Sequence, residues 1–176
     1  MVLGESRQAG RSRSVARHKY AREQRAAVVR GEITDAQALA NIAARAATGR
    51  TKEEWIDDVG DLLSGTNRKN LFDTSGVHIP RVAFGQTGFK WFLQEPQFGP
   101  NNNQVRHFVG WVVAGFEVGE PAKMINDFRE SCCGPSETVQ DQILGNAGVE
   151  LGKGVRSGAV PLNSVAEWVL TYVRAL

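Results

Sequence analysis

The sequence predicts a mainly α-helical single domain with a close-packed, glycine-faced helix pair, a short aromatic loop or hairpin and a basic N-terminal arm. Three observations support this class. Segments with apolar residues at helical spacing alternate with glycine-containing breaks along most of the chain. Residues 104–119 lack proline and place apolar side chains on nearly every side, which is typical of a central helix. Apolar residues make up 41% of the chain, which is enough for a core.

The first 30 residues predict a basic arm ahead of a mildly acidic body. They carry eight Lys and Arg against two Glu, a charge of +6, so the remainder carries about −4 because the whole chain is +2. Residues 1–11 are expected to be disordered, whereas residues 12–30 are rich in helix formers. Their thin apolar stripe predicts a surface helix or an arm that orders on contact. A basic face suits nucleic acid, an acidic partner or an anionic membrane; a solvated or packing face is the alternative.

The next segment, residues 31–65, predicts a helical hairpin. Thr34 is expected to cap the first helix, because its hydroxyl can accept a bond from a first-turn amide. Thr51 and Glu54 have the spacing of a capping box and predict the start of the second helix. Gly65 is expected to end that helix.

Residues 66–176 are expected to form the core domain that carries the site. Their first part, residues 66–100, contains three prolines and a concentration of aromatic residues. Val77 to Phe84 is compatible with a short edge strand interrupted by a proline. The aromatic density favours a packed cover over the core, with an aromatic ligand platform as the alternative.

A glycine-bearing pair of helices is expected at the centre of this domain. The central helix runs from Gln104 to Gly119, and a second helix covers residues 138–155. Three glycines of the second helix share one face with Asp141: Gly145, Gly148 and Gly152. Each glycine costs roughly 1 kcal/mol inside a helix, and close approach of the two helices offsets that cost. The pairing is therefore expected to bring Asp141 toward the N-terminus of the central helix.

Arg106 and His107 fall in the first turn of the central helix, at the mouth of the most apolar segment. Helix N-termini favour anions, and a carboxylate bonded to an imidazole fixes its tautomer. We therefore expect His107 to act as a general base, Asp141 to orient it and Arg106 to hold an anionic group. The alternative is a structural histidine bonded to a loop carbonyl. Three more residues are expected to bind substrate: Asn103, Asn146 and Glu95.

Two other chemistries remain open. One is a thiol nucleophile at Cys132 or Cys133, which are adjacent and so rarely form a disulfide. The other is a carboxylate pair for glycoside hydrolysis, drawn from Glu95, Glu117 and Asp141. No metal site is expected, because no H-x-x-x-H or Cys-x-x-Cys pattern accompanies the histidine. No cofactor is expected either.

Two motifs carry a resemblance to other proteins. Residues 103–108 read N-Q-V-R-H-F and residues 141–145 read D-Q-I-L-G. Together with flanking positions over residues 84–172, they resemble a bacterial family of uncharacterised domains with an N-Q-x-R-H-F helix followed by a D-x-x-L-G helix. The resemblance implies that His107 and Asp141 belong to one site, and it implies no particular activity.

The favoured function is a small bacterial hydrolase-like domain, used as an effector or toxin, with a His–Asp site. The alternative is a non-enzymatic binding or cargo domain that docks through its basic arm on a protein partner or secretion machinery. Nucleic acid is a further partner that the arm suits. The sequence shows no secretory signal and no apolar run of the roughly 20 residues that a membrane span needs. We therefore expect a soluble protein that is cytoplasmic or exported by a signal-peptide-independent route.

Overall fold

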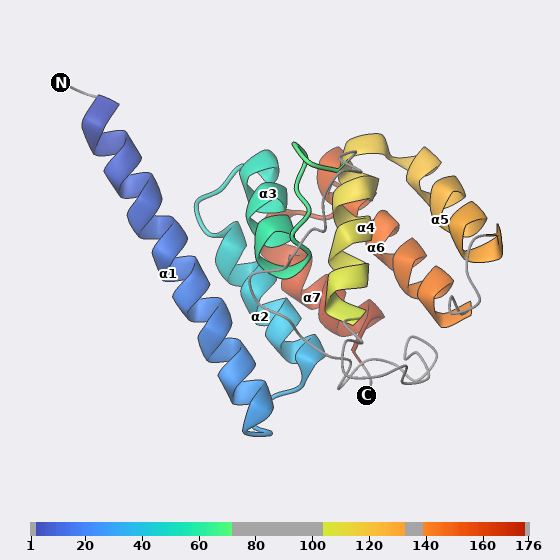
Figure 1. Cartoon of the computed structure of the whole chain (residues 1–176), viewed down its shortest axis with the longest axis horizontal. Coiled ribbons are helices and arrows are strands. Elements are labelled where there is room, and N and C mark those ends of the chain that lie inside the picture. The colour runs from blue at the N-terminus through green and yellow to red at the C-terminus, as the bar shows by residue number, and fades with distance from the viewer. Residues whose placement is uncertain (1–2, 72–103, 133–138, 175–176) are drawn as a thin grey trace.

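The computed structural model describes residues 3–71, 104–132 and 139–174, with side chains described over 15–71, 104–127 and 140–174. It confirms the predicted class: these residues form helices and contain no strand (Figure 1). The α-helices are α1 (Leu3–Val29), α2 (Asp35–Ala47), α3 (Lys52–Leu63), α4 (Gln104–Val118), α5 (Glu120–Cys132), α6 (Val139–Ser157) and α7 (Val165–Tyr172). No helix in the described part of the chain is long and apolar enough to cross a membrane.

The longest helix, α1, begins earlier than expected. The sequence predicted disorder up to residue 11, but the helix starts at Leu3. Starting a helix is costly, whereas extending one adds a hydrogen bond for each residue fixed. Good helix formers such as Gln8 and Ala9 therefore extend α1 past the glycines at positions 4 and 10. Figure 1 shows the N-terminal half of α1 reaching beyond the other helices.

One face of α1 is anchored to the body by specific contacts. Ala21 is fully buried. The Oε1 atom of Gln24 accepts a hydrogen bond of 2.7 Å from Nδ2 of Asn41 on α2. Arg17 Nη1 lies 2.7 Å from Asp58 Oδ2 on α3. Burial raises the pKa of the Asp58 carboxyl, and the neighbouring guanidinium groups offset only part of that effect.

The predicted caps of α2 and α3 are confirmed. Thr34 Oγ1 accepts a bond of 3.2 Å from the main-chain N–H of Gln37. Thr51 and Glu54 form both bonds of a capping box at the start of α3. Gly65 ends α3 with a positive φ of 75°, a conformation that glycine adopts without steric cost. The two helices share one hydrophobic core with α4, α6 and α7.

The close contact between α4 and α6 forms the centre of the fold. Three glycines have no room for a side chain: a β-carbon would lie 2.4 Å from the main-chain oxygen of Val149 at Gly115, 2.5 Å from that of Phe108 at Gly148, and 2.1 Å from that of Val112 at Gly152. Gly148 lies against Phe108, and Gly152, four residues later, lies against Val112, also four residues later. The two helices therefore run parallel (Figure 1). Their N-termini therefore lie at the same end of the pair.

The other glycines of these helices have different surroundings. A β-carbon at Gly110 would meet nothing within 4 Å, so this residue is not part of the close contact. Gly145 instead faces the side chain of Asn126 on α5. Gly119 ends α4 with a φ of 71°, which confirms the predicted end of the central helix.

The last helix, α7, closes the core against α2. Its residues Val165 and Val169 are fully buried. Ser164 and Glu167 have the three-residue spacing from which a capping box is expected, but that expectation is wrong, because the Ser164 side chain makes no capping bond. A 3-10 turn leads directly into α7 and gives Ser164 a helical backbone (φ −101°, ψ 0°), whereas a capping residue needs an extended one.

Several expected features lie outside the described residues. They are the edge strand at Val77 to Phe84 and the aromatic cover of residues 66–100 beyond residue 71.

The glycine contact generates a matched pair of variants. We expect Gly152→Ala to lower the free energy of unfolding by about 2–3 kcal/mol, because the added methyl group overlaps the oxygen of Val112. Gly110→Ala should instead raise it by up to about 1 kcal/mol, because alanine favours the helix and the position is open. Urea denaturation measures both, and equal effects of the two substitutions would contradict the close contact.

Candidate functional site

The structure brings His107 and Asp141 together where the first turns of α4 and α6 meet. The imidazole Nε2 of His107 lies 3.1 Å from the main-chain oxygen of Asp141. The same nitrogen lies 3.9 Å from Oδ1 of the Asp141 carboxylate. The side chains are only 18% and 10% exposed, respectively. The two residues thus form one largely buried pair.

The hydrogen bond determines the tautomer of the imidazole. A carbonyl oxygen only accepts hydrogen bonds, so Nε2 of His107 carries the proton. In the neutral ring the lone pair then belongs to Nδ1. The main chain of Asp141 orients the ring, and its carboxylate adds a negative charge within ion-pair distance. The pair therefore combines the carbonyl bond expected of a structural histidine with the carboxylate expected near a catalytic one.

Trp111 forms the wall next to this pair, one turn further along α4. The rings of His107 and Trp111 meet edge to face, with centroids 6.4 Å apart and planes at 62°. Trp111 is 8% exposed, and its β-carbon packs close to Gly148, where an added β-carbon would lie 3.0 Å away. The site is thus bounded by an apolar aromatic surface on the side of α4.

The structure does not place the other expected site residues together. Arg106 precedes the histidine in the first turn of α4 and is exposed. Asn103 and Glu95 lie outside the described residues. Asn146 follows Asp141 by five residues, which places it about 140° around α6. Its side chain is bonded to α5, so the structure brings only part of the expected set together.

A polar network between α5 and α6 holds Asn146. Its Nδ2 donates to Asp127 Oδ1 at 2.9 Å, and its Oδ1 accepts from Asn126 Nδ2 at 3.0 Å. Gln142 Nε2 also donates to Asp127 at 2.9 Å. These bonds lower the pKa of the Asp127 carboxyl, the bond from Asn146 first. Because a carboxylate only accepts, Asp127 sets the orientation of every amide in the network.

Asn126 lies at the buried end of this network. It is fully buried, and its Oδ1 accepts no hydrogen bond from the described residues. The side chain packs against Gly145, where a β-carbon would lie 2.6 Å from that oxygen. Sequence reasoning missed this network, although Gln142 and Asn146 have the one-turn spacing that places two amides on one helix face.

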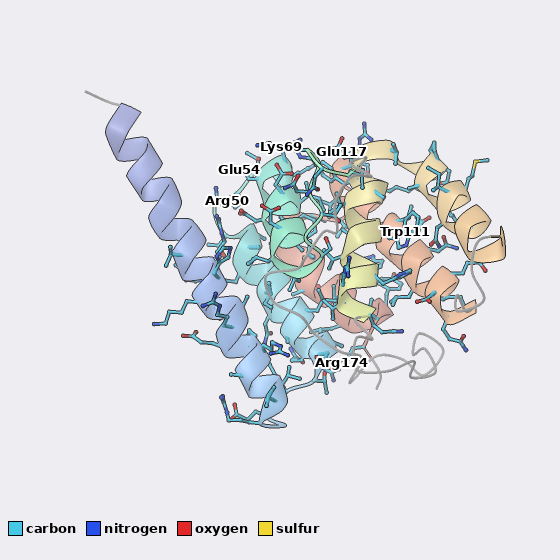
Figure 2. The ribbon with its side chains drawn as sticks, viewed as in Figure 1. Arg50, Glu54, Lys69, Trp111, Glu117 and Arg174 are labelled. Atoms are coloured by element: carbon cyan, nitrogen blue, oxygen red, sulfur yellow. The ribbon has the colours of Figure 1, made fainter. Side chains whose placement is uncertain are left out.

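The alternative chemistries gain no support from the described residues. Cys133 and the side chain of Cys132 lie outside them. Glu117 follows His107 by ten residues on α4, roughly 15 Å along the helix axis, near the opposite end from its N-terminus (Figure 2). That distance exceeds the separation of about 5–9.5 Å that paired glycosidase carboxylates require. The pairing of Glu117 with Asp141 is therefore wrong.

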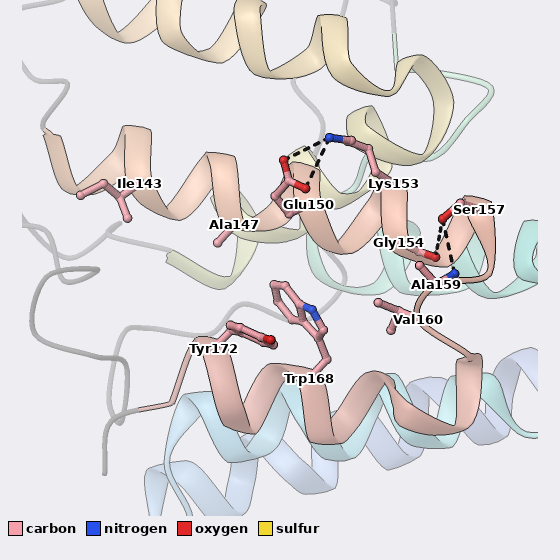
Figure 3. A pocket seen from close by; sticks show the side chains of 10 residues that line it. All are labelled: Ile143, Ala147, Glu150, Lys153, Gly154, Ser157, Ala159, Val160, Trp168 and Tyr172. Carbon is pink, nitrogen blue, oxygen red and sulfur yellow. Dashed lines mark hydrogen bonds and ion pairs between the residues drawn. The ribbon is translucent and has the colours of Figure 1, made fainter.

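A groove separates α6 from α7 and has a volume of about 740 Å³ (Figure 3). Trp168 and Tyr172 line its α7 side, with ring centroids 4.7 Å apart. Ile143 and Ala147 line the α6 side. These two residues lie on the face of α6 opposite Asp141, because the helix turns by about 100° per residue. The groove is thus separate from the His107 pair.

Among the described residues, no three or more His, Cys, Asp and Glu side chains are grouped so that they would hold a metal ion. Comparison of the chain with protein-family models, curated proteins and solved structures found no match. The resemblance to the N-Q-x-R-H-F family therefore stays an expectation from the sequence.

The network predicts a loss of stability in acid that depends on Asp127. A lowered pKa means that Asp127 stabilises the folded chain above its unfolded pKa of about 3.9, and that this contribution is lost as the pH falls through the folded value. Asp127→Asn should be less stable than the wild type by about 1 kcal/mol at pH 7. The difference should shrink below pH ~4.

Urea denaturation over a pH series measures this difference. Glu53→Gln, which removes an exposed carboxylate elsewhere, is the control and should leave stability unchanged. A difference between wild type and Asp127→Asn that stays constant with pH would show that the charge of Asp127 does not hold the network.

The hydrogen bond to Asp141 predicts the protonation pattern of the imidazole. At a pH where the ring is neutral, His107 should populate the Nε2–H tautomer, because that nitrogen donates to the main-chain oxygen. Long-range ¹H–¹⁵N correlation spectra distinguish the two tautomers by their nitrogen shifts. His107→Gln assigns the signals, and an Nδ1–H tautomer would contradict the geometry.

Proposed function

We propose that the chain is a small hydrolase-like domain in which His107 acts as the general base. One observation carries the proposal: Nε2 of His107 is bonded to the main-chain oxygen of Asp141 at 3.1 Å while the carboxylate lies 3.9 Å away. The main chain holds the ring in one tautomer and leaves Nδ1 as the basic nitrogen. A base held in this way needs no reorientation before it takes a proton.

The Asp141 carboxylate supports this role by its charge. When Nδ1 accepts a proton, the ring becomes positively charged, and a carboxylate within 4 Å stabilises that charge. The pair is largely buried, which strengthens the interaction because water screens it less. Asp141 thus orients the ring through its main chain and stabilises the charged ring through its side chain.

The proposed reaction is hydrolysis of a substrate that carries an anionic group. His107 accepts a proton from water as the water oxygen bonds to the electrophilic carbon or phosphorus. The bond to the leaving group then breaks, and the proton passes from His107 to that group. Arg106 and the neighbouring N-termini of α4 and α6 favour a phosphate or carboxylate on the substrate.

Substitutions at the pair should separate the two roles of Asp141. With p-nitrophenyl acetate, p-nitrophenyl phosphate and bis(p-nitrophenyl) phosphate as probes, His107→Ala should lower kcat/KM at least about 100-fold on the substrate that is turned over. Asp141→Asn should cost only about tenfold, because the main-chain oxygen still orients the ring. His18→Ala on α1 is the matched control and should retain full activity.

Circular dichroism and urea denaturation establish that each variant is folded. Folded His107→Ala with unchanged activity, or a wild type inactive on all three probes, would contradict the hydrolase and favour the non-enzymatic binding or cargo domain. The proposed role as a bacterial effector or toxin adds a second readout. Expression of the wild type should slow cell growth, and His107→Ala should relieve that effect.

A further inference from the structure

The charge of the chain is concentrated on one helix. Residues 3–29, which form α1, contain seven Lys and Arg and two Glu, a formal charge of +5. The whole chain is +2, so the other residues together carry about −3. A polyanion is therefore attracted to α1 and repelled by the rest of the chain, which orients the molecule with α1 toward it.

The packing of α1 leaves a basic face pointing outward. The face that carries Ala21 and Gln24 is covered by the body. Arg22 and Arg25 are exposed. The Lys19 side chain is 78% exposed, and its Nζ lies 3.9 Å from the exposed carboxylate of Glu23. The cations are thus displayed to solvent along the part of α1 that is fixed to the body.

The outward face continues along the helix in the sequence. Arginines occur at positions 7, 11, 22 and 25, which are three, four or eleven residues apart and so share one side of a helix. These positions span about 27 Å at 1.5 Å per residue. A straight row of this length suits a ligand whose negative charges are also regularly spaced.

The composition of this face selects among polyanionic partners. Exposed large apolar residues on the described part of α1 are Val15 and Val29, at 67% and 75% exposure. Protein interfaces usually centre on buried aromatic or other large apolar anchors, and membrane-surface helices need a broad apolar face. Neither feature is present among the described side chains of α1. A phosphate backbone needs only positive charge and hydrogen-bond donors.

We propose that the outward face of α1 binds the phosphate backbone of a nucleic-acid duplex. Arg22, Arg25 and Lys19 supply the contacts from the docked part of the helix. Contacts of this kind position the protein without reading the base sequence. The proposal is independent of the His107 site, since the two lie on different helices and use different residues.

Two charge-matched variants of the full chain test the proposal. Arg22→Ala/Arg25→Ala removes two cations from the outward face of α1. Lys69→Ala/Arg174→Ala removes two exposed cations from the body, away from that face (Figure 2). Binding to fluorescein-labelled DNA and RNA duplexes is measured by fluorescence anisotropy over a series of salt concentrations. Circular dichroism checks that all variants keep the helical content of the wild type.

The wild type should bind a duplex with an affinity that falls steeply with salt. The α1 variant should bind roughly tenfold more weakly or worse, and the slope of log K against log salt should fall by about two. The body variant should bind within about twofold of the wild type. Comparison of the DNA and RNA duplexes shows which of the two is preferred. Binding of either duplex that depends on α1 supports the proposal.

Three outcomes would overturn the proposal. One is a wild type that binds neither duplex at low salt. Another is equal weakening by the two variants, which would show an effect of net charge alone. The third is α1-dependent binding of polyglutamate or phosphatidylserine vesicles with no binding of duplexes, which would assign the face to an acidic protein or a membrane.

Discussion

The contact between the main chains of α4 and α6 is the constraint on which the rest of the structure depends. Gly148 and Gly152 bring main-chain atoms of the two helices into direct contact, and no larger residue fits there. That distance and the parallel direction place the first turns of both helices together, and with them His107 and Asp141. On α6, Gly145 faces α5 in the same way, so α5 also packs closely against α6. A small change at this contact would therefore alter the geometry of the site.

The sequence was most informative where the determining interactions are local. A capping box such as that of Thr51 and Glu54 involves residues three apart, so spacing alone predicts it. Ser164 and Glu167 have the same spacing, but the chain enters α7 through a 3-10 turn, and the capping bond is absent. The start of α1 was missed for a related reason. Propensity describes single residues, whereas extension of a helix depends on the turns already formed.

At the candidate site too, some features could be predicted from the sequence and others depend on packing. The pattern of glycines on one helix face was sufficient to predict that Asp141 approaches His107. It could not predict that the hydrogen bond goes to the main-chain oxygen, because every residue has such an oxygen and only the packing selects one. Asn146 was expected beside the same pair, yet a rotation of about 140° along α6 turns it toward Asp127. Predicting the bonds of that network requires knowing where α5 crosses α6.

The ion pair between Arg17 and Asp58 has a consequence for the reach of α1. Because burial raises the pKa of Asp58, the folded chain takes up a proton at this carboxyl more readily than the unfolded chain does. The stability linked to this proton is thus present in acid and is lost as the pH rises through the folded value. Near neutral pH the charged pair is a weak source of stability, but it holds α1 at one position along its axis. Together with the contacts of Ala21 and Gln24, it determines how far the N-terminal part of α1 extends past the other helices.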